Sequence, residues 1–244
     1  MATVPSRIEI SKKFLDLLAR KRALKIAPSL DQQFTFKSGR KSVNFVNVGS
    51  LTDGDALQTL KWAYASFVKS LLDSGELEDF DIVFGPSYKG IPLAAIACEG
   101  LYELYGINKH FLYDRKESKG YGDKTSDEFF VGAGTFKPGM KILMVDDVIT
   151  TGGAKIDSFE KLDKLGPHKI VGIVVAVDRQ EKMGDAENVD ALSATQAIER
   201  DYQVKTFAFL PMTSIFELVK KDLKPEIRQA WVEYYEKYGA VELK

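Results

Sequence analysis

One segment of the chain places apolar, acidic, hydroxyl and small residues in a fixed order. It reads Ile142-Leu143-Met144-Val145-Asp146-Asp147-Val148-Ile149-Thr150-Thr151-Gly152-Gly153-Ala154. The apolar start predicts a buried strand that carries two carboxylates to the edge of a sheet. The loop that follows opens a helix, so its backbone N–H groups and hydroxyls would surround an anion, which glycines at 152 and 153 let the main chain approach closely. We therefore predict that the acids hold sugar hydroxyls and that the loop holds a phosphate.

A second loop, Gly85-Pro86-Ser87-Tyr88-Lys89-Gly90, follows the strand predicted at 81–84 and precedes a helix. Its N–H groups and the Lys89 ammonium would point toward the same sheet edge and form another anion site. Each feature also has a purely structural interpretation. Lys89 alone would be a solvated surface residue, and an isolated Asp-Asp pair would be a capped turn.

A long stretch from about 114 to 137 is rich in Gly, Lys and Asp and carries Arg115, Lys116 and Lys119. Glycines at 120 and 122 supply hinges. A charge run is usually a solvated face, but long loops in compact domains are often functional lids. Because two anion sites are predicted nearby, we interpret this stretch as a mobile cationic lid that closes over the bound anion.

Strands must alternate with helices to position these loops. We expect an amphipathic helix from 8 to 24 and a hairpin from 34–36 and 43–48. A further helix should lie between Asp53, which would be its N-cap, and Ser74. Two strand-turn-helix units follow, with strands at 81–84, 110–113, 141–145 and 170–177, helices at 92–104 and 154–165, and a terminal helix after Pro225. This pattern predicts an α/β fold with a mainly parallel central sheet flanked by helices, in which ligands bind at the carboxyl ends of the strands.

Composition limits the class of protein. The chain has 34 Lys and Arg against 35 Asp and Glu, for a formal net charge of −1, which gives no reason to expect nucleic acid or a membrane as a partner. Cys98, His110 and His168 are too few for a zinc cluster. The chain has no apolar run of about 18 residues. We expect a single cytoplasmic domain spanning residues 1–244.

The complete segment from Ile142 to Ala154 resembles the signature with which type I phosphoribosyltransferases bind 5-phosphoribosyl 1-diphosphate (PRPP). Four further stretches together resemble orotate phosphoribosyltransferases. They are Phe36-Lys37-Ser38-Gly39-Arg40-Lys41-Ser42, Phe84 to Pro92, Arg115-Lys116-Glu117-Ser118-Lys119 and Val177-Asp178-Arg179-Gln180-Glu181. The resemblance implies the type I phosphoribosyltransferase fold, with a small hood contributed largely by about residues 1–50.

The resemblance also implies a role for each matching position. Lys37 would reach the diphosphate or the base from the hood, and Phe45 and Val46 would lie at the base pocket. Arg179 would pair with the carboxylate of orotate. The PRPP contacts would come from Tyr88, Lys89, Arg115, Lys116, Lys119, Tyr121, Asp146, Asp147, Val148, Ile149, Thr150, Thr151, Gly152, Gly153 and Ala154. Lys119, Lys89 and Asp147 would be the catalytic residues.

For the reaction, the resemblance implies that N1 of orotate displaces diphosphate from PRPP and gives orotidine 5′-phosphate. Mg²⁺ would be held mainly through the diphosphate and water rather than by protein ligands. A homodimer is implied, because the lid of the family reaches into the neighbouring subunit's site. We expect no fused decarboxylase domain, because the sequence ends at Lys244.

Some positions depart from the family pattern. Tyr121 stands where a histidine is common, Val46 where a second aromatic is common and Gly153 where a hydroxyl is common, while residues 123–130 extend the lid. Two other functions stay open. A non-catalytic PRPP sensor would not need the lid cations or Arg179, and a purine phosphoribosyltransferase would lack Arg179 as an anion partner for its base.

Removal of the Lys119 charge should lower turnover more than it weakens PRPP binding. The negative charge of the leaving diphosphate grows in the transition state, so a lid cation stabilises that state more than the ground state. Steady-state kinetics with varied PRPP measure both effects. Unchanged turnover in the variant would count against the lid mechanism.

Overall fold

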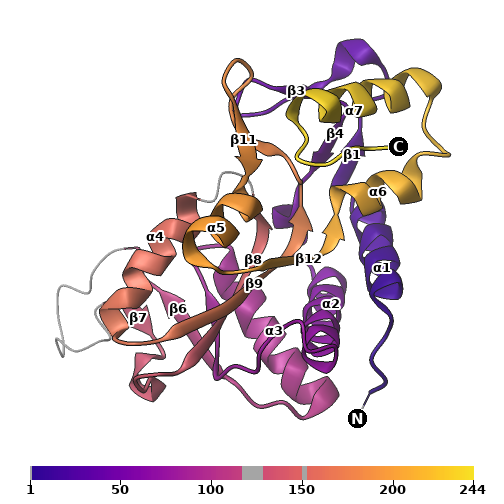
Figure 1. Ribbon diagram of the computed structural model, residues 1–244. Coiled ribbons are helices and arrows are strands. Elements are labelled where there is room, and N and C mark those ends of the chain that lie inside the picture. The colour runs from indigo at the N-terminus through magenta and orange to yellow at the C-terminus, as the bar shows by residue number, and fades with distance from the viewer. Residues whose placement is uncertain (1, 117–128, 150–152) are drawn as a thin grey trace.

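The structure, a computed structural model, describes residues 2–116, 129–149 and 153–244, with the backbone alone for residues 153–156. Its centre is a six-stranded sheet in the order β12-β9-β8-β5-β6-β7 (Figure 1). All neighbouring pairs are parallel except β6–β7. In sheet order the strands are β12 (Thr206–Pro211), β9 (Lys169–Asp178), β8 (Lys141–Ile149), β5 (Ile82–Gly85), β6 (His110–Asp114) and β7 (Phe130–Val131). The predicted mainly parallel α/β sheet is confirmed.

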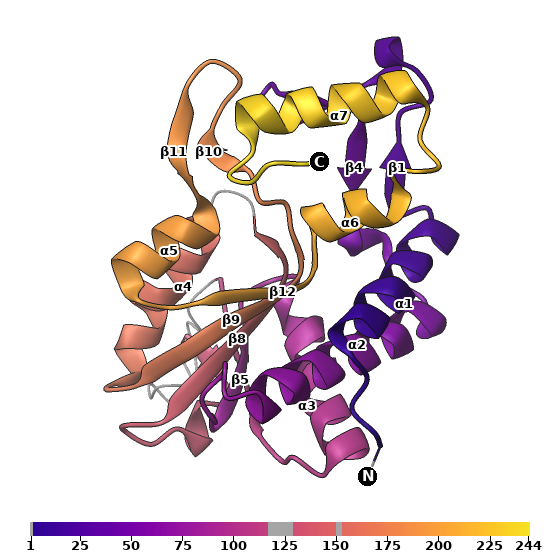
Figure 2. The same cartoon turned by 45° about the vertical axis from the view of Figure 1, so that its right-hand side comes forward.

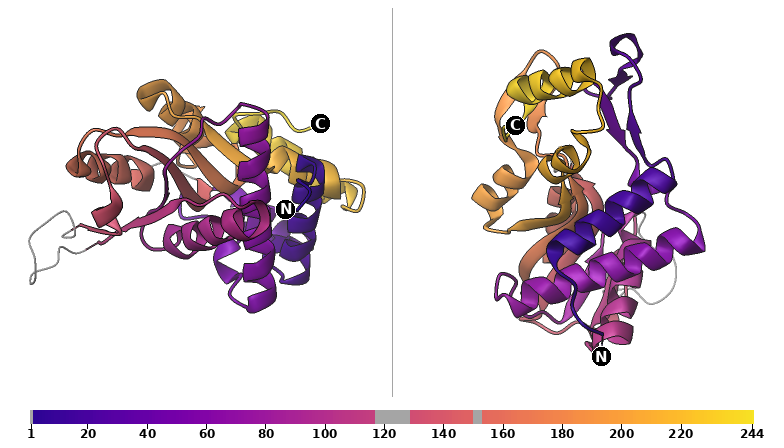
Figure 3. Two further views of the ribbon diagram at one scale, coloured as in Figure 1. Left: turned by 90° about the horizontal axis from the view of Figure 1, so that it is seen from below. Right: turned by 90° about the vertical axis from the view of Figure 1, so that its right-hand side faces the viewer.

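Helices cover both faces of the sheet (Figure 2). On one face lie α1, α2 and α3, with α1 packed along α2 (Figure 3), and on the other lie α4 and α5. Their bounds are α1 (Arg7–Arg20), α2 (Gly54–Asp73), α3 (Gly90–Tyr105), α4 (Gly153–Leu162) and α5 (Ala194–Tyr202). Asp53 caps α2 as expected, since its carboxylate accepts a hydrogen bond from the N–H of Ala56 at 2.9 Å.

Strand β8 shows why both faces need helices. Leu143 and Val145 belong to the buried cluster under α1, α2 and α3, while Ile142 and Met144 belong to the cluster under α4 and α5. Successive side chains of a strand point to opposite faces, so a strand buried on both faces is apolar throughout. Polar side chains are therefore restricted to the strand ends.

The second part of the molecule sits above the carboxyl edge of the sheet and consists of short antiparallel pairs with the C-terminal helices (Figure 1). The pairs are β1–β4, β2–β3 and β10–β11. Their bounds, with those of the helices, are β1 (Leu24–Ile26), β2 (Phe34–Thr35), β3 (Lys41–Ser42), β4 (Asn44–Val46), β10 (Lys182–Gly184), β11 (Val189–Ser193), α6 (Met212–Val219) and α7 (Pro225–Tyr238). Single-turn 3-10 helices occupy 30–32, 48–50, 133–135 and 163–165.

Four sequence predictions need correction. Residues 43–48 do not form the second arm of a hairpin with 34–36, because β2 pairs with β3 whereas β4 pairs with β1. The helix predicted from 8 to 24 ends at Arg20, and Leu24 instead begins β1, because Arg22 takes a φ of 52°, which a helix cannot continue. Strand β8 runs to Ile149 rather than Val145, and the helix predicted at 154–165 ends at Leu162.

The described helices include none that is both long enough and apolar enough to cross a membrane.

In the stretch predicted as a lid, Phe130 and Val131 form β7 against β6, and the N–H of Arg115 donates to the carbonyl of Phe129 at 2.7 Å. Residues 117–128, which include Lys119 and Tyr121, lie outside the described residues.

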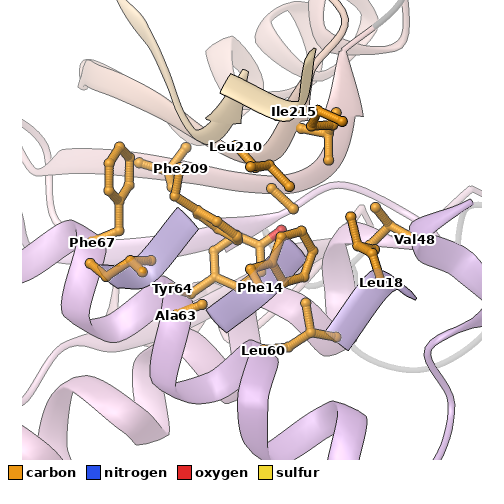
Figure 4. Close-up of a cluster of buried hydrophobic side chains, with 14 of the residues drawn as sticks. Phe14, Leu18, Val48, Leu60, Ala63, Tyr64, Phe67, Phe209, Leu210 and Ile215 are labelled. Atoms are coloured by element: carbon orange, nitrogen blue, oxygen red, sulfur yellow. The ribbon is translucent and has the colours of Figure 1, made fainter. Parts of the chain in front are cut away.

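Phe209 of β12 joins the central sheet to the helices α1 and α2. Its ring makes edge contacts with Phe14 and Tyr64, both at 4.9 Å between centroids, and with Phe67 at 5.7 Å (Figure 4). The side chain is 1% exposed, so its removal would leave a cavity that three aromatic rings cannot easily fill.

Phe209→Ala should therefore lower the free energy of unfolding by about 3–5 kcal/mol in urea titrations. Leu57→Ala is the matched control, because Leu57 lies on α2 but is 37% exposed. The control should change the free energy by less than about 1 kcal/mol. Equal effects of the two substitutions would contradict the central position of Phe209.

Candidate active site

The carboxyl ends of β5, β8 and β9 meet at one edge of the sheet, beneath the short antiparallel pairs (Figure 1). Parallel pairing puts the loop after Gly85, the acids of β8 and the turn after Asp178 side by side. These are the three places from which the sequence predicted sugar, phosphate and base contacts. The topology thus brings together predicted residues that are about 90 positions apart in the sequence.

The acidic pair contacts the loop after β5 directly. The Lys89 Nζ lies 2.9 Å from the Asp147 Oδ2, with the lysine side chain 64% exposed and the aspartate side chain 11% exposed. Asp146 and Asp147 are both buried, and each accepts a hydrogen bond from the backbone N–H of the next residue. The arrangement fixes a buried carboxylate below an exposed ammonium, which leaves positive charge facing solvent at the sheet edge.

Tyr64 supports the acidic pair from the α2 side, a role that the sequence did not reveal. Its hydroxyl donates to the Asp146 carbonyl at 2.7 Å, and the side chain is fully buried. Burial, reinforced by the charges of Asp146 and Asp147, raises the pKa of Tyr64 well above its usual value. The hydroxyl therefore stays a protonated donor at neutral pH. In the sequence this tyrosine was only one apolar position among several on a helical face.

Asp114 anchors the loop that carries Tyr88 and Lys89. Its buried carboxylate accepts hydrogen bonds from the N–H of Ser87 at 2.5 Å and from the Ser87 hydroxyl at 3.1 Å. Lys161 of α4 donates to the same carboxylate at 2.5 Å. From the sequence, Asp114 is predicted only as the start of the lid, although its place at the end of a parallel strand is a signal that could have indicated an anchoring role.

Glycine is required where this loop turns into α3. A Cβ at Gly85 would lie 2.4 Å from the Gly90 carbonyl oxygen, and a Cβ at Gly90 would lie 2.9 Å from the Val145 carbonyl oxygen. Both distances are shorter than side chains tolerate. The two glycines therefore let the loop after β5 lie directly against β8.

The start of the predicted lid lies against the same loop. The Lys116 ammonium is 4.5 Å from the centroid of the exposed Tyr88 ring. Arg115 is partly buried, and among the described residues its Nε has no hydrogen-bond partner. Gly153 and Ala154 are the first residues of α4, the helix that follows the acidic strand in the sequence. Thr150, Thr151 and Gly152 lie outside the described residues.

A cavity of about 460 Å³ lies beside the acidic strand. Ile149, Arg179 and Lys37 all line it, so three predicted site residues from separate elements share one space. Phe36 forms part of the wall, and the Arg179 guanidinium lies over its ring at 3.9 Å from the centroid. The remaining lining residues are Ser38, Arg40, Asp178, Glu181, Lys182, Met183, Gly184, Asp185, Ser193 and Ala194.

Phe45 and Val46 of β4 are not among the described residues that line this cavity. Phe45 instead lies behind Phe36, with 6.2 Å between ring centroids. Phe36, for which the sequence predicted no individual role, lines the cavity in its place. Asp178 also faces the cavity, and burial raises the pKa of its carboxyl group.

The fold and this paired site define a class of protein. The family model for the phosphoribosyl transferase domain matches residues 58–206, which include β5, β8 and β9 with their loops. The chain is therefore a phosphoribosyltransferase.

More similar proteins identify the family within this class. Orotate phosphoribosyltransferase of Bifidobacterium adolescentis is 35% identical over 240 residues, covering 95% of this chain and 98% of the relative. That of Neurospora crassa is 40% identical over 216 residues, covering 86% and 89%. The crystal structure of orotate phosphoribosyltransferase from Francisella tularensis superposes with a TM-score of 0.76 at 35% identity, covering 93% and 98%. The chain belongs to the orotate phosphoribosyltransferase family and has its type I fold.

Asp114→Asn should lower the free energy of unfolding by about 2 kcal/mol and raise the KM for PRPP, because the loop with Lys89 loses a charged anchor. Ser87→Ala is a milder comparison that removes only the 3.1 Å hydroxyl contact. Urea titration and steady-state kinetics measure the two effects. If Asp114→Asn leaves both the stability and the KM for PRPP at wild-type values, Asp114 does not anchor this loop.

Proposed function

We propose that this chain catalyses its family's reaction with the residues at the carboxyl edge of the sheet, using PRPP with Mg²⁺ as the phosphoribosyl donor. The reaction transfers the phosphoribosyl group of PRPP to N1 of orotate and gives orotidine 5′-phosphate and diphosphate, a step of pyrimidine biosynthesis. The observation that carries the assignment of the site is Arg179 in the cavity beside the acidic strand.

Arg179 suits a planar base that bears a carboxylate. A guanidinium group is a flat fork that binds a carboxylate through two parallel hydrogen bonds, and Phe36 supports one face of this fork. Ile149 lines the cavity and ends the strand that carries Asp146 and Asp147. A base in the cavity would therefore lie next to the predicted ribose site. An uncharged purine would leave the guanidinium without an anionic partner, which favours orotate over the purine alternative.

Catalysis would be electrostatic and would need no protein nucleophile. Asp146 and Asp147 would hold the ribose hydroxyls, while the start of α4 with residues 150–154 would hold the 5-phosphate. Lys89, with Tyr88 and the lid residues Arg115, Lys116, Lys119 and Tyr121, would contact the diphosphate. Negative charge grows on the leaving group in the transition state, so fixed cations stabilise that state more than bound PRPP. These cations also argue against a non-catalytic PRPP sensor.

The residues present are compatible with Mg²⁺ held through the substrate. Among the described residues, no group of three or more His, Cys, Asp or Glu side chains could form a protein cage for a metal. Mg²⁺ commonly keeps several waters and binds through substrate phosphates. Bound in this way, it would neutralise charge on the diphosphate. Asp147 would stay paired with Lys89, which keeps the ammonium near the leaving group.

We further propose a homodimer that works in the cytoplasm, with lid residues shared between subunits. The support for the dimer is the resemblance of the Arg115 to Lys119 stretch to the family's shared lid. The support for a reducing compartment is Cys98, the single cysteine, which has no partner within the chain for a disulfide.

Incubation of the chain with PRPP and Mg²⁺ should deplete orotate, followed by its ultraviolet absorbance, and should leave adenine, guanine and hypoxanthine unchanged. Chelation of Mg²⁺ with EDTA should abolish the loss, and added Mg²⁺ should restore it. Absence of any PRPP-dependent loss of orotate from folded protein would refute the proposed function. Consumption of a purine instead would favour the purine alternative.

A further inference from the structure

The guanidinium of Arg179 is tied on one of its edges to a neighbouring carboxylate. Glu181 Oε1 accepts a hydrogen bond from Nη2 of Arg179 at 2.6 Å and one from Nε at 3.1 Å. Both side chains are shielded, with 19% of Arg179 and 13% of Glu181 exposed. The fork has a second edge, formed by Nη1 and the other hydrogen of Nη2, which makes no hydrogen bond with any of the described residues and could therefore receive a ligand.

The two contacts of this guanidinium restrict different motions. Phe36 supports its face at 3.9 Å, which fixes the plane of the group. Glu181 holds the Nε edge, which fixes the rotation of the group within that plane. With both contacts in place, the orientation of the guanidinium is fixed, and its free edge can point in only one direction. Because the side chain is already ordered in this way, less of its conformational entropy is lost when a ligand binds.

A second cation keeps Glu181 in place. Arg40 Nη1 lies 3.8 Å from Glu181 Oε2, and the Arg40 side chain is only 3% exposed. Arg40 itself donates to the backbone carbonyls of Lys182, Met183 and Asp185, so it cannot easily turn away. Glu181 therefore lies between two guanidinium groups. An incoming carboxylate would add to this arrangement at the free edge of Arg179 rather than displace Glu181.

The backbone of the same turn is bound by the C-terminal part of the chain. The Tyr235 hydroxyl on α7 donates to the Arg179 carbonyl at 2.5 Å. The N–H of Ala240 donates to the Gln180 carbonyl at 2.9 Å, and the Gln180 side chain accepts from the N–H of Thr213 at 2.9 Å. Tyr235 is 1% exposed, and burial raises its pKa well above the usual value, so its hydroxyl stays a donor.

We propose that Glu181 and Tyr235 are positioning residues for the base site. Glu181 orients the free edge of the Arg179 guanidinium toward the carboxylate of orotate. Tyr235 holds the backbone of Arg179 at the position from which its side chain lines the cavity. The inference rests on the proposed role of Arg179 in binding that carboxylate. It assigns a part of the base site to the C-terminal helix α7, which lies far from β8 in the sequence. Neither residue needs to touch the substrate.

The test compares the KM for orotate with the KM for PRPP in Glu181→Gln and Tyr235→Phe. Glu181→Gln should raise the KM for orotate about tenfold, because a neutral amide holds the fork more weakly than a carboxylate. Tyr235→Phe should raise it about threefold through the loss of one neutral hydrogen bond. The KM for PRPP should stay within about twofold of wild type. The preference for orotate over uracil, which lacks the carboxylate, should fall in parallel.

The matched control is Tyr238→Phe. Tyr238 lies on the same helix, and its hydroxyl donates to the Ala186 carbonyl at 3.2 Å rather than to the Arg179 turn. The phenyl ring keeps the contact with Arg40, whose guanidinium carbon lies 4.6 Å from the ring centroid. This control should leave both KM values unchanged. Tyr235→Phe keeps the buried ring, so it provides a folded variant if Glu181→Gln does not fold.

Arg179→Gln separates failure of this inference from failure of the proposed function. If Arg179→Gln raises the KM for orotate while Glu181→Gln and Tyr235→Phe do not, the positioning roles are wrong and the base site stands. If Arg179→Gln leaves the KM for orotate unchanged, Arg179 does not bind the base and the underlying assignment fails. An equal rise of both KM values in Glu181→Gln and Tyr235→Phe would mean general loosening of the fold and would also overturn the inference.

Discussion

The parallel pairing of β5, β8 and β9 is the constraint on which the rest of the structure depends. Their side chains are buried on both faces of the sheet, so charged groups fit only at the strand ends. The carboxyl ends of these strands lie at one edge, which brings Lys89, Asp147 and Arg179 into one region. In the proposed function a phosphorylated sugar and an anionic base both bind at this edge, where the sheet holds the charges in fixed positions.

The charged groups at this edge are paired with groups of opposite charge. Neutral hydrogen-bond donors from buried side chains hold the backbone beside each pair. Lys89 faces Asp147, and Arg179 faces Glu181. An unpaired buried charge is expensive, whereas a paired and hydrogen-bonded charge keeps its position. Tyr64 and Tyr235 donate to main-chain carbonyls beside these pairs, one from α2 and one from α7. The two tyrosines thus connect distant helices to the two halves of the site.

The sequence predicted best what depends on local order. The apolar run before Asp146, the cap at Asp53 and the helix after Pro225 all follow from periodicity and turn chemistry, and all are present. The end of β8 was missed because its length is set by the partner strand β9, which pairs with it as far as Ile149. The pairing of β1 with β4 was missed because a local positive φ at Arg22 ends α1 early.

Long-range contacts account for the other parts of the site that the sequence did not show. Tyr64, Asp114 and Tyr235 act through hydrogen bonds to residues 82, 27 and 56 positions away, and no local pattern marks such partners. Phe36 rather than Phe45 forms the cavity wall because the segment that follows β2 brings the Phe36 ring under the Arg179 guanidinium. Resemblance gave the residue types of the site, and tertiary packing decided which of them face the cavity.

The central claim is that the acidic strand and Arg179 form one site for a phosphoribosylated, carboxylate-bearing base. A crystal structure of the chain with orotidine 5′-phosphate tests it most directly. The account predicts the carboxylate of the base within hydrogen-bond distance of Arg179, the ribose hydroxyls at Asp146 and Asp147, and the phosphate at the start of α4. Binding of the nucleotide with its carboxylate away from Arg179, or its phosphate away from α4, would contradict the account.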